Sequence, residues 1–293
     1  MPQPVKRKYC YAFLPHAGLG NKLFVWAQCI LFAKNNQCDY SVKGWYHLHV
    51  RTFLRIIFRG EKRHEYYFDP FKSGLLDNAK FLGFNESNGR FVSQVDSGKV
   101  IDNEAVFYFN EFNKDDHFVT LRDYRELISK VFWSKLKLRY IPSDRENDIS
   151  IHIRRGDFVS TGWVSPLEYY KTILINIRKY LGFQVNAMIY SDGTREELAD
   201  ILNEPNTLFY NTVNPMYDLV SMSRSKLIIL SANSTYGMWA AFLSEAAIIR
   251  KGEDFVKGYI RSEADRLRWY EGELNEDLRQ WPDLLTQTLR KLQ

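Results

Sequence analysis

The stretch "KLIILSANSTYGMWAAFLSEAAIIR", residues 226–250, holds the pattern that decides the fold. An apolar run rich in β-branched residues (226–231) precedes a helical stretch (235–244) and a second apolar run (246–250). Short apolar runs without polar alternation are typical of strands that are buried on both faces of a sheet. The stretch therefore predicts a strand, a crossover helix and a parallel strand.

The same alternation extends back to residue 148. Further strands are predicted at 148–155, 186–191 and 207–211, and helices at 166–180, 194–202 and 215–225. Because strands that alternate with helices form parallel, doubly wound sheets, residues 146–260 are predicted to be a Rossmann-like domain that ends with the strand at 246–250. Residues 261–293 are expected to be a C-terminal helical segment.

The N-terminal part of the chain opens in the same way. A strand is predicted at 9–13, a loop after it, and a strongly apolar helix at 22–34. Residues 44–110 are rich in aromatics and turn signals and give no clear pattern. An amphipathic helix at 122–133 is followed by a polar linker at 139–148. Residues 1–145 are therefore expected to form a first domain of the same α/β class.

Composition and charge narrow the function classes. The net charge of +5 is compatible with an anionic ligand or a membrane surface, but it is too small to favour nucleic acid. Cys10, Cys29 and Cys38 lack the spacing of a disulfide framework or a zinc site, so buried thiols in a reducing compartment are expected. No apolar run suits a signal peptide or a membrane span, which favours a cytoplasmic protein. Peripheral contact through the basic residues 50–64 is the alternative to a solvated helix face there.

Four polar clusters follow predicted strands: "HAGLGN" (16–21), "RRGD" (154–157), "SDG" (191–193) and "SANST" (231–235). Ligands of open α/β sheets bind in the crevice at the carboxyl ends of the strands. The four clusters therefore predict one ligand cleft between two Rossmann-like domains.

In the "RRGD" cluster, the alternation of a strand places His152 and Arg154 on one face. An arginine at a strand end offers a planar fork of donors that fits a phosphate group. The alternative is an internal salt bridge between Arg155 and Asp157 in the loop that leaves the strand. For His152, a core histidine and a ligand contact are equally open.

Two further clusters combine small residues with a predicted helix N-terminus. Asn233, Ser234 and Thr235 would cap a helix, and the same groups would also cradle a phosphate. Gly18 and Gly20 permit positive φ and close approach of a ligand to the backbone, with a plain tight turn as the alternative.

Two acidic residues complete the candidates. Asp192 places a carboxylate at a strand end, and Asp218 lies in an otherwise apolar helix, where it could pair with the edge of guanine or cap a neighbouring group. The sequence has no D-x-D motif and no His/Cys cluster with metal-ligand spacing, so no metal and no other cofactor is expected.

Together the motifs resemble those of the α-1,2-fucosyltransferases and of the wider group with α-1,6- and protein O-fucosyltransferases. The resemblance rests on "AGLGNKLFVWA" (17–27), "HIRRGDF" (152–158), "YSDG" (190–193) and "ANSTYGMWAAFL" (232–243), in the order and spacing of that family. Lys22, Gly193 and the pair Gly237-Met238 depart from the common pattern. The resemblance covers the chain at motif level, except for residues 44–120.

The resemblance implies a GT-B-like fold, with an acceptor-side domain at 1–145 and a GDP-sugar-binding domain at 146–260. It implies metal-independent transfer of L-fucose from GDP-β-L-fucose, with inversion, to O2 of galactose in a glycan, with a lipid-linked acceptor as one form. Bacterial O-antigen or capsule synthesis is the expected setting.

The resemblance also implies roles for single residues. Arg154 would contact the β-phosphate, Ser234 and Thr235 would hold the diphosphate, and Asp218 would contact guanine. Asp157 is the candidate general base, with the orientation of an arginine as its alternative role. The remaining donor-site candidates are Gly18, Gly20, Asn21, His152, Asp192 and Asn233.

Two other functions stay open at this point. One is a transferase of the same fold that uses another GDP-sugar or forms another linkage. The other is a non-catalytic module that binds nucleotide sugars.

Overall fold

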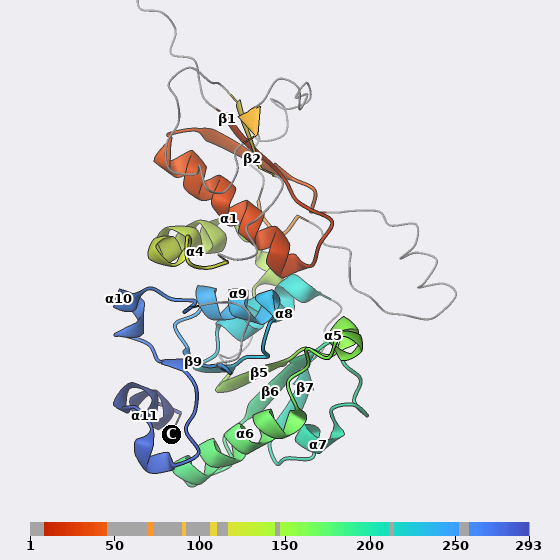
Figure 1. Ribbon diagram of the computed structural model, residues 1–293, viewed down its shortest axis with the longest axis vertical. Coiled ribbons are helices and arrows are strands. Elements are labelled where there is room, and N and C mark those ends of the chain that lie inside the picture. The colour runs from red at the N-terminus through yellow and green to blue at the C-terminus, as the bar shows by residue number, and fades with distance from the viewer. Residues whose placement is uncertain are drawn as a thin grey trace, which may run out of the picture. The chain divides into compact units, whose positions relative to one another are not determined.

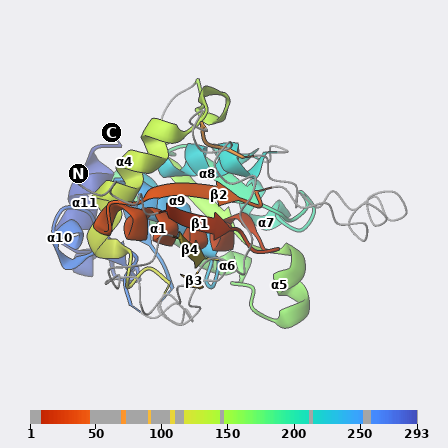
Figure 2. The same ribbon diagram turned by 90° about the horizontal axis from the view of Figure 1, so that it is seen from above.

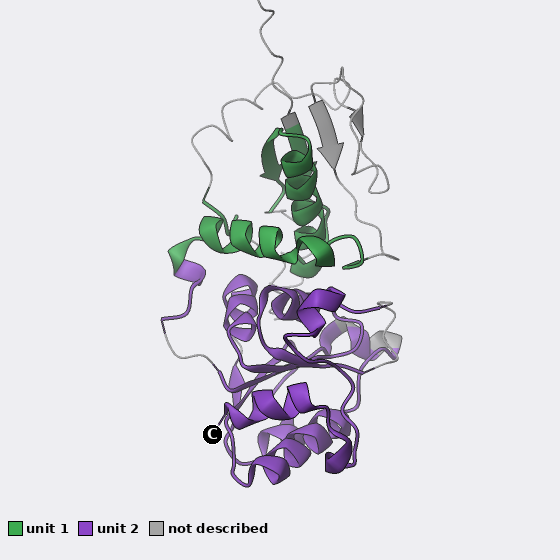
Figure 3. Cartoon of the chain, turned by 90° about the vertical axis from the view of Figure 1, so that its left-hand side faces the viewer, with its two compact units in different colours: residues 1–138 green, residues 139–293 purple. Residues whose placement is uncertain are grey.

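The computed structural model describes residues 9–45, 69–72, 90–91, 106–109, 117–143, 147–210, 214–251 and 258–292. The chain divides into two compact units, residues 1–138 and 139–293 (Figure 3). Each unit contains its own parallel sheet, which confirms the predicted α/β class. The basic stretch 50–64 lies outside the described residues. Within the described ranges, none of the helices combines the length and the hydropathy that a bilayer-spanning helix requires.

The N-terminal unit is a parallel sheet with the strand order β2-β1-β4-β3. Helix α1 runs along β1 and β2, and α4 lies beside α1 (Figure 2). The elements are β1 (Tyr9–Phe13), α1 (Leu19–Asn35), β2 (Asp39–Lys43), β3 (Arg90–Phe91), β4 (Val106–Phe109), the 3₁₀ turn η3 (Arg122–Tyr124) and α4 (Arg125–Lys135).

Helix α1 begins three residues earlier than the sequence predicts. Gly18 is its N-cap residue, with φ −59°, and Gly20 and Asn21 already lie inside the helix. Neither Gly18 nor Gly20 belongs to the positive-φ glycines, so neither adopts the left-handed conformation that its lack of a side chain would permit. The helix is buried on nearly all sides, and it packs against β1, β2 and α4.

Lys22 has a structural partner in the N-terminal unit. Its side chain is buried, and Nζ donates hydrogen bonds to the carbonyl oxygens of Gly44 and Trp45 at 2.9 and 2.8 Å. Burial lowers the pKa of the Lys22 ammonium to about 8. The lysine thus ties the first turn of α1 to the chain that leaves β2. The thiols of Cys10 and Cys29 are buried between β1 and α1, with their sulfurs 3.2 Å apart.

The described residues of the C-terminal unit form six parallel strands in the order β7-β6-β5-β8-β9-β10. Chain order therefore runs outward from β5 in one direction and from β8 in the other. This is the Rossmann arrangement, with the order reversing between β5 and β8. The strands are β5 (Ile149–Ile153), β6 (Ala187–Ser191), β7 (Thr207–Tyr210), β8 (Leu227–Ile229), β9 (Ala247–Ile249) and β10 (Glu271–Gly272).

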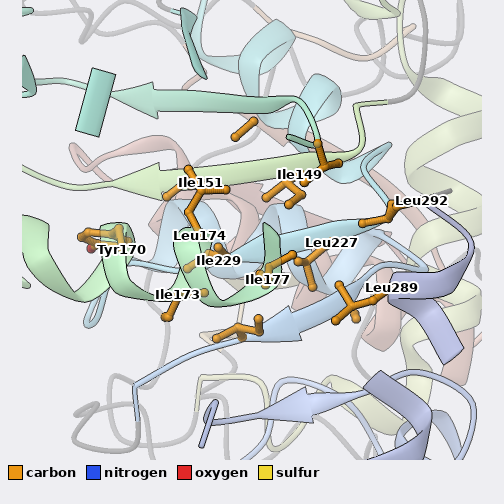
Figure 4. Packing of buried hydrophobic residues seen from close by; sticks show 14 of the residues in the cluster. Ile149, Ile151, Tyr170, Ile173, Leu174, Ile177, Leu227, Ile229, Leu289 and Leu292 are labelled. Carbon is orange, nitrogen blue, oxygen red and sulfur yellow. The ribbon is translucent and has the colours of Figure 1, made fainter. Parts of the chain in front are cut away.

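Helices cover both faces of this sheet. Helices α6 and α11 lie on one face, and α8 and α9 lie on the other (Figure 1). The alternate residues Ile149 and Ile151 of β5 point toward α6, where they meet Tyr170, Leu174 and other apolar side chains (Figure 4). The helical elements are η4 (Leu138–Tyr140), α5 (Gly156–Thr161), α6 (Leu167–Leu181), α7 (Ala199–Leu202), α8 (Pro215–Ser223), α9 (Thr235–Leu243), α10 (Glu263–Arg266), η5 (Leu278–Gln280) and α11 (Asp283–Arg290).

The structure corrects three details of the sequence analysis. The last strand of the sheet is β10, which pairs with β9 and lies within the segment expected to be helical. Residues 195–198 form a turn, and the helix begins only at Ala199 rather than at 194. The residues after Arg155 begin the short helix α5 instead of a loop. From the C-terminal segment, Trp281, Leu285, Leu289 and Leu292 pack into the core of the sheet.

The C-terminal end of α9 is held by Arg261, which is completely buried. Its guanidinium donates hydrogen bonds to the carbonyl oxygens of Ala246 at 2.7 Å and of Ser244 at 2.9 Å, and to that of Ala241 at 3.3 Å. A cation at a helix C-terminus satisfies carbonyl groups that have no partner inside the helix. Arg261 therefore fixes the position of α9 from its far end.

Replacing Arg261 by Ala should lower the free energy of unfolding by roughly 3 kcal/mol, because buried carbonyl groups lose their donors and a cavity forms. Thermal melting followed by circular dichroism would measure the loss. Arg279→Ala is the matched control, since the Arg279 side chain is 90% exposed. Equal melting temperatures for the two variants would contradict the role given to Arg261.

Candidate functional site

Three of the four polar clusters lie together at the carboxyl ends of the strands in the C-terminal sheet. Strand β5 pairs in parallel with both β6 and β8, so the carboxyl ends of these strands lie side by side. Arg154 follows β5, Asp192 follows β6, and residues 231–235 follow β8. The strand order reverses between β5 and β8, and such a reversal leaves a crevice for ligands at the carboxyl ends of the two strands. Gly18, Gly20 and Asn21 belong to the N-terminal unit.

Asp192 holds the chain at the end of β5. One carboxylate oxygen pairs with a terminal nitrogen of Arg154 at 2.7 Å, and the other accepts a hydrogen bond from the backbone N–H of Arg155 at 2.7 Å. Gly156 has φ +30°, and a Cβ at that position would come within 2.4 Å of the Asp192 carboxylate. The carboxylate thus packs against a residue that must be glycine, and it orients Arg154 from the neighbouring strand.

The sequence leaves an Arg155–Asp157 salt bridge open as an alternative. The backbone of Asp157 lies in α5, but its side chain falls outside what the structure describes, so its role stays a prediction. The carboxylate that contacts both arginines of the motif is Asp192. Sequence reasoning identified Asp192 as a candidate but not this contact, because it joins residues 37 positions apart.

His152 lies on the face of the sheet that α9 covers. The residue is only 4% exposed, the centroid of its ring lies 5.5 Å from that of Tyr236, and a Cβ on Gly237 would come within 2.5 Å of its Nδ1. Burial, with a smaller effect from the charge of Arg154, lowers the pKa of His152 to about 3. The ring is therefore neutral at physiological pH and packs as a core residue beneath the start of α9. A direct contact with a donor stays a prediction.

The N-terminus of α9 carries the other half of the candidate site. Asn233 adopts a left-handed conformation, with φ +61°, and Thr235 is the first helical residue. Ser234 occupies the N-cap position and is buried, but its side chain makes no capping hydrogen bond. Helix N-termini favour negative charge. The cluster therefore has the backbone geometry of an anion site without a side-chain cap from Ser234.

Ser165, which lies just before α6, also reaches this loop. Its hydroxyl accepts a hydrogen bond from the backbone N–H of Ala232 at 3.3 Å and is buried. The segment before α6 thereby supports the loop that leads into α9. No local pattern in the sequence links these two segments.

Asp218 lies in the first turn of α8, at the same edge of the sheet. Asn214 caps this helix by accepting a hydrogen bond from the backbone N–H of Tyr217 at 3.3 Å, so Asp218 is not needed for that purpose. Tyr217 stacks on Tyr210, which in turn lies edge-on to Tyr190. Sequence reasoning missed this tyrosine cluster, since its members come from three separate elements.

Among the described residues, no group of three or more His, Cys, Asp or Glu side chains is placed to hold a metal ion. The expectation of a metal-independent reaction stays a prediction.

Gly237→Ala tests the packing of His152 under α9. Alanine is favoured over glycine in a helix by about 1 kcal/mol, so propensity alone would stabilise the protein. We expect instead a loss of about 1–3 kcal/mol in the free energy of unfolding, because the new methyl group collides with the His152 ring.

The measurement is chemical denaturation of both single variants and of the double variant with His152→Ala. The effects of the two substitutions should be strongly non-additive, since removal of the ring leaves room for the methyl group. A Gly237→Ala protein more stable than the parent would contradict the packing described.

Comparisons with known proteins agree on the class of this chain. Residues 83–252 match the model of the family described as glycosyl transferase family 11. The O-antigen biosynthesis glycosyltransferase WbnK of Escherichia coli is 33% identical over 137 residues, which are 43% of this chain and 45% of WbnK. The chain is thus aligned with about half the length of this relative.

Solved structures with a similar fold include that of the α-1,6-fucosyltransferase NodZ soaked with GDP-fucose. It has a TM-score of 0.51 and 14% identity, and the match covers 86% of this chain and 98% of NodZ. NodZ from Bradyrhizobium gives the same score and identity, over 84% of this chain and 97% of NodZ. At this identity the likeness concerns the fold, and it agrees with the predicted GT-B-like class.

The family match covers more than half of the chain and includes all three clusters at the edge of the C-terminal sheet. It confirms the family relationship predicted from the motifs. The chain belongs to glycosyl transferase family 11.

Proposed function

We propose that this protein transfers L-fucose from GDP-β-L-fucose to O2 of a galactose in a glycan acceptor, with inversion and without a metal ion. One observation carries the proposal. Arg154, oriented by Asp192, and the N-terminus of α9 occupy the ends of the two strands between which the strand order reverses. This edge of the sheet is where a nucleoside diphosphate sugar would bind.

The chemistry requires positive charge at that place. Cleavage of the bond between fucose and GDP leaves negative charge on the β-phosphate, while the sugar becomes oxocarbenium-like. Without a metal, fixed donors have to stabilise the charge, and each preorganised donor contributes about 3 kcal/mol. A guanidinium held by Asp192 and the amide groups at the start of α9 supply such donors.

The other roles follow from the same placement. Ser234 and Thr235 would hold the diphosphate, Asn233 would shape the turn, and Asp218 would accept hydrogen bonds from guanine. His152 and Asp192 would act mainly on the geometry of α9 and of Arg154. Asp157 is proposed as the general base that activates the acceptor hydroxyl.

The remaining parts of the proposal concern the N-terminal unit and the setting. Gly18, Gly20 and Asn21 would lie near the transferred sugar, and this unit would bind the acceptor. The relatives support the substrate class: NodZ was soaked with GDP-fucose, and WbnK is described as an enzyme of O-antigen biosynthesis. We therefore propose a cytoplasmic enzyme that acts on a lipid-linked or soluble glycan.

A second candidate is the same transfer with another linkage, because NodZ forms an α-1,6 linkage. A single assay separates the candidates. The protein is incubated with a panel of galactosides and either GDP-fucose or GDP-mannose, in parallel reactions with EDTA or with added Mg²⁺, and the product linkage is determined by NMR. We expect an α-1,2-linked fucose on galactose. Turnover of GDP-mannose in preference to GDP-fucose, or activity only with added Mg²⁺, would contradict the proposal.

Arg154→Ala should lower kcat by about 10²–10³-fold, the loss expected when one preorganised donor to the developing charge is removed. Arg154→Lys keeps the charge but loses the planar fork of donors, so its kcat should lie between those of the wild-type protein and Arg154→Ala. Arg268→Ala, at an exposed arginine outside the site, is the control. Steady-state kinetics with GDP-fucose measures the effect, and wild-type kcat in Arg154→Ala would rule out the mechanism.

A further inference from the structure

We propose that Trp163, packed edge-on against Phe158, forms an aromatic platform that binds a pyranose ring of the acceptor glycan beside Arg154. The inference rests on the proposed function, and it adds an acceptor contact in the C-terminal unit. Phe158 ends the motif at 152–158 but was given no role there, and Trp163 lies outside the quoted motifs.

Trp163 differs from the other tryptophans of the chain. All seven tryptophans lie in the described residues, and Trp163 is 54% exposed, whereas the other six are buried or half-buried. Val159, one turn away on α5, is 48% exposed. A tryptophan side chain carries a large apolar area, so its exposure next to a functional site points to a ligand that covers it.

The platform is built by α5 and its C-terminal turn. Gly162 ends the helix in a left-handed conformation, with φ +72°. The backbone N–H of Trp163 then donates a hydrogen bond to the carbonyl oxygen of Phe158 at 3.2 Å. The two rings meet edge-on, with centroids 5.9 Å apart and an angle of 89° between the planes. Both rings are therefore held by a short local structure.

The platform adjoins the proposed catalytic arginine. The guanidinium carbon of Arg154 lies 5.2 Å from the centroid of the Phe158 ring, a cation–π distance. Asp192, which follows the neighbouring strand β6, forms an ion pair with the same guanidinium. A ring stacked on Trp163 would thus lie near the group that contacts the leaving phosphate.

The chemistry of the platform favours a sugar over the guanine base. A pyranose has a face of C–H groups that stacks on a flat aromatic ring, and hydroxyl groups at its rim that stay in contact with water. A nucleotide base is held in a cleft that covers most of its surface, whereas Trp163 as a whole residue is 54% exposed. An acceptor glycan that extends into solvent fits an open aromatic surface.

The test compares Trp163→Ala, Trp163→Phe and the control Leu208→Ala, which removes an apolar side chain that is 60% exposed on β7. Binding of lactose without any donor is followed by saturation-transfer NMR, and KM values for lactose and for GDP-fucose are measured separately. We expect about a tenfold weaker lactose affinity and higher lactose KM for Trp163→Ala, a change of roughly 1.4 kcal/mol. Trp163→Phe should recover most of the loss, and the KM for GDP-fucose should not change.

Unchanged lactose binding in Trp163→Ala would overturn the platform while leaving fucose transfer intact. An increase in the KM for GDP-fucose of the same size would assign the ring to the donor and overturn the inference as well. Conversely, lactose binding that depends on Trp163 in a protein that does not turn over GDP-fucose would support the platform and refute the proposed function.

Discussion

The reversal of strand order between β5 and β8 is the constraint on which the rest of the C-terminal unit depends. Because the six described strands are parallel, each connection between them has to return the chain from the carboxyl end of one strand to the amino end of the next. After β5 the chain turns toward α6, and after β8 it turns toward α9, on the other face. The two connections diverge, and the edge between them is left for a ligand.

The residues at this edge also serve the core, so the site and the fold are coupled. In β5, Ile149 and Ile151 face the apolar layer under α6, while His152 faces α9. A neutral, buried His152 fills the space that a side chain at position 237 would otherwise take. Arg261 fixes the opposite end of the same helix. Helix α9 is thus held at its N-terminal end by His152 and at its C-terminal end by Arg261. Neither residue needs to touch a substrate to fix the position of the helix.

The sequence predicts much of this architecture because most strands of the C-terminal sheet are short apolar runs. The predicted bounds agree to within two residues for strands β5, β6, β8 and β9 and for helices α6, α8 and α9. Strand β10 could not be predicted in this way, since Glu271 and Gly272 carry no apolar pattern, and the Glu271 carboxylate is held by Arg250 and by the backbone N–H groups of Ile260 and Arg261. The role of Asp192 was equally hidden, because its two partners come from a neighbouring strand. The exposure of Trp163 depends on how α5 ends at Gly162, which a motif does not encode.

The central claim is that a guanosine diphosphate group binds between the end of β5 and the start of α9. Hydrogen–deuterium exchange with and without GDP tests it most directly, since backbone amides at a phosphate site become protected on binding. The account predicts that GDP slows exchange in two separate peptides, one over residues 153–163 and one over residues 231–240. Binding of GDP without protection in either peptide, or with protection only in the N-terminal unit, would contradict it.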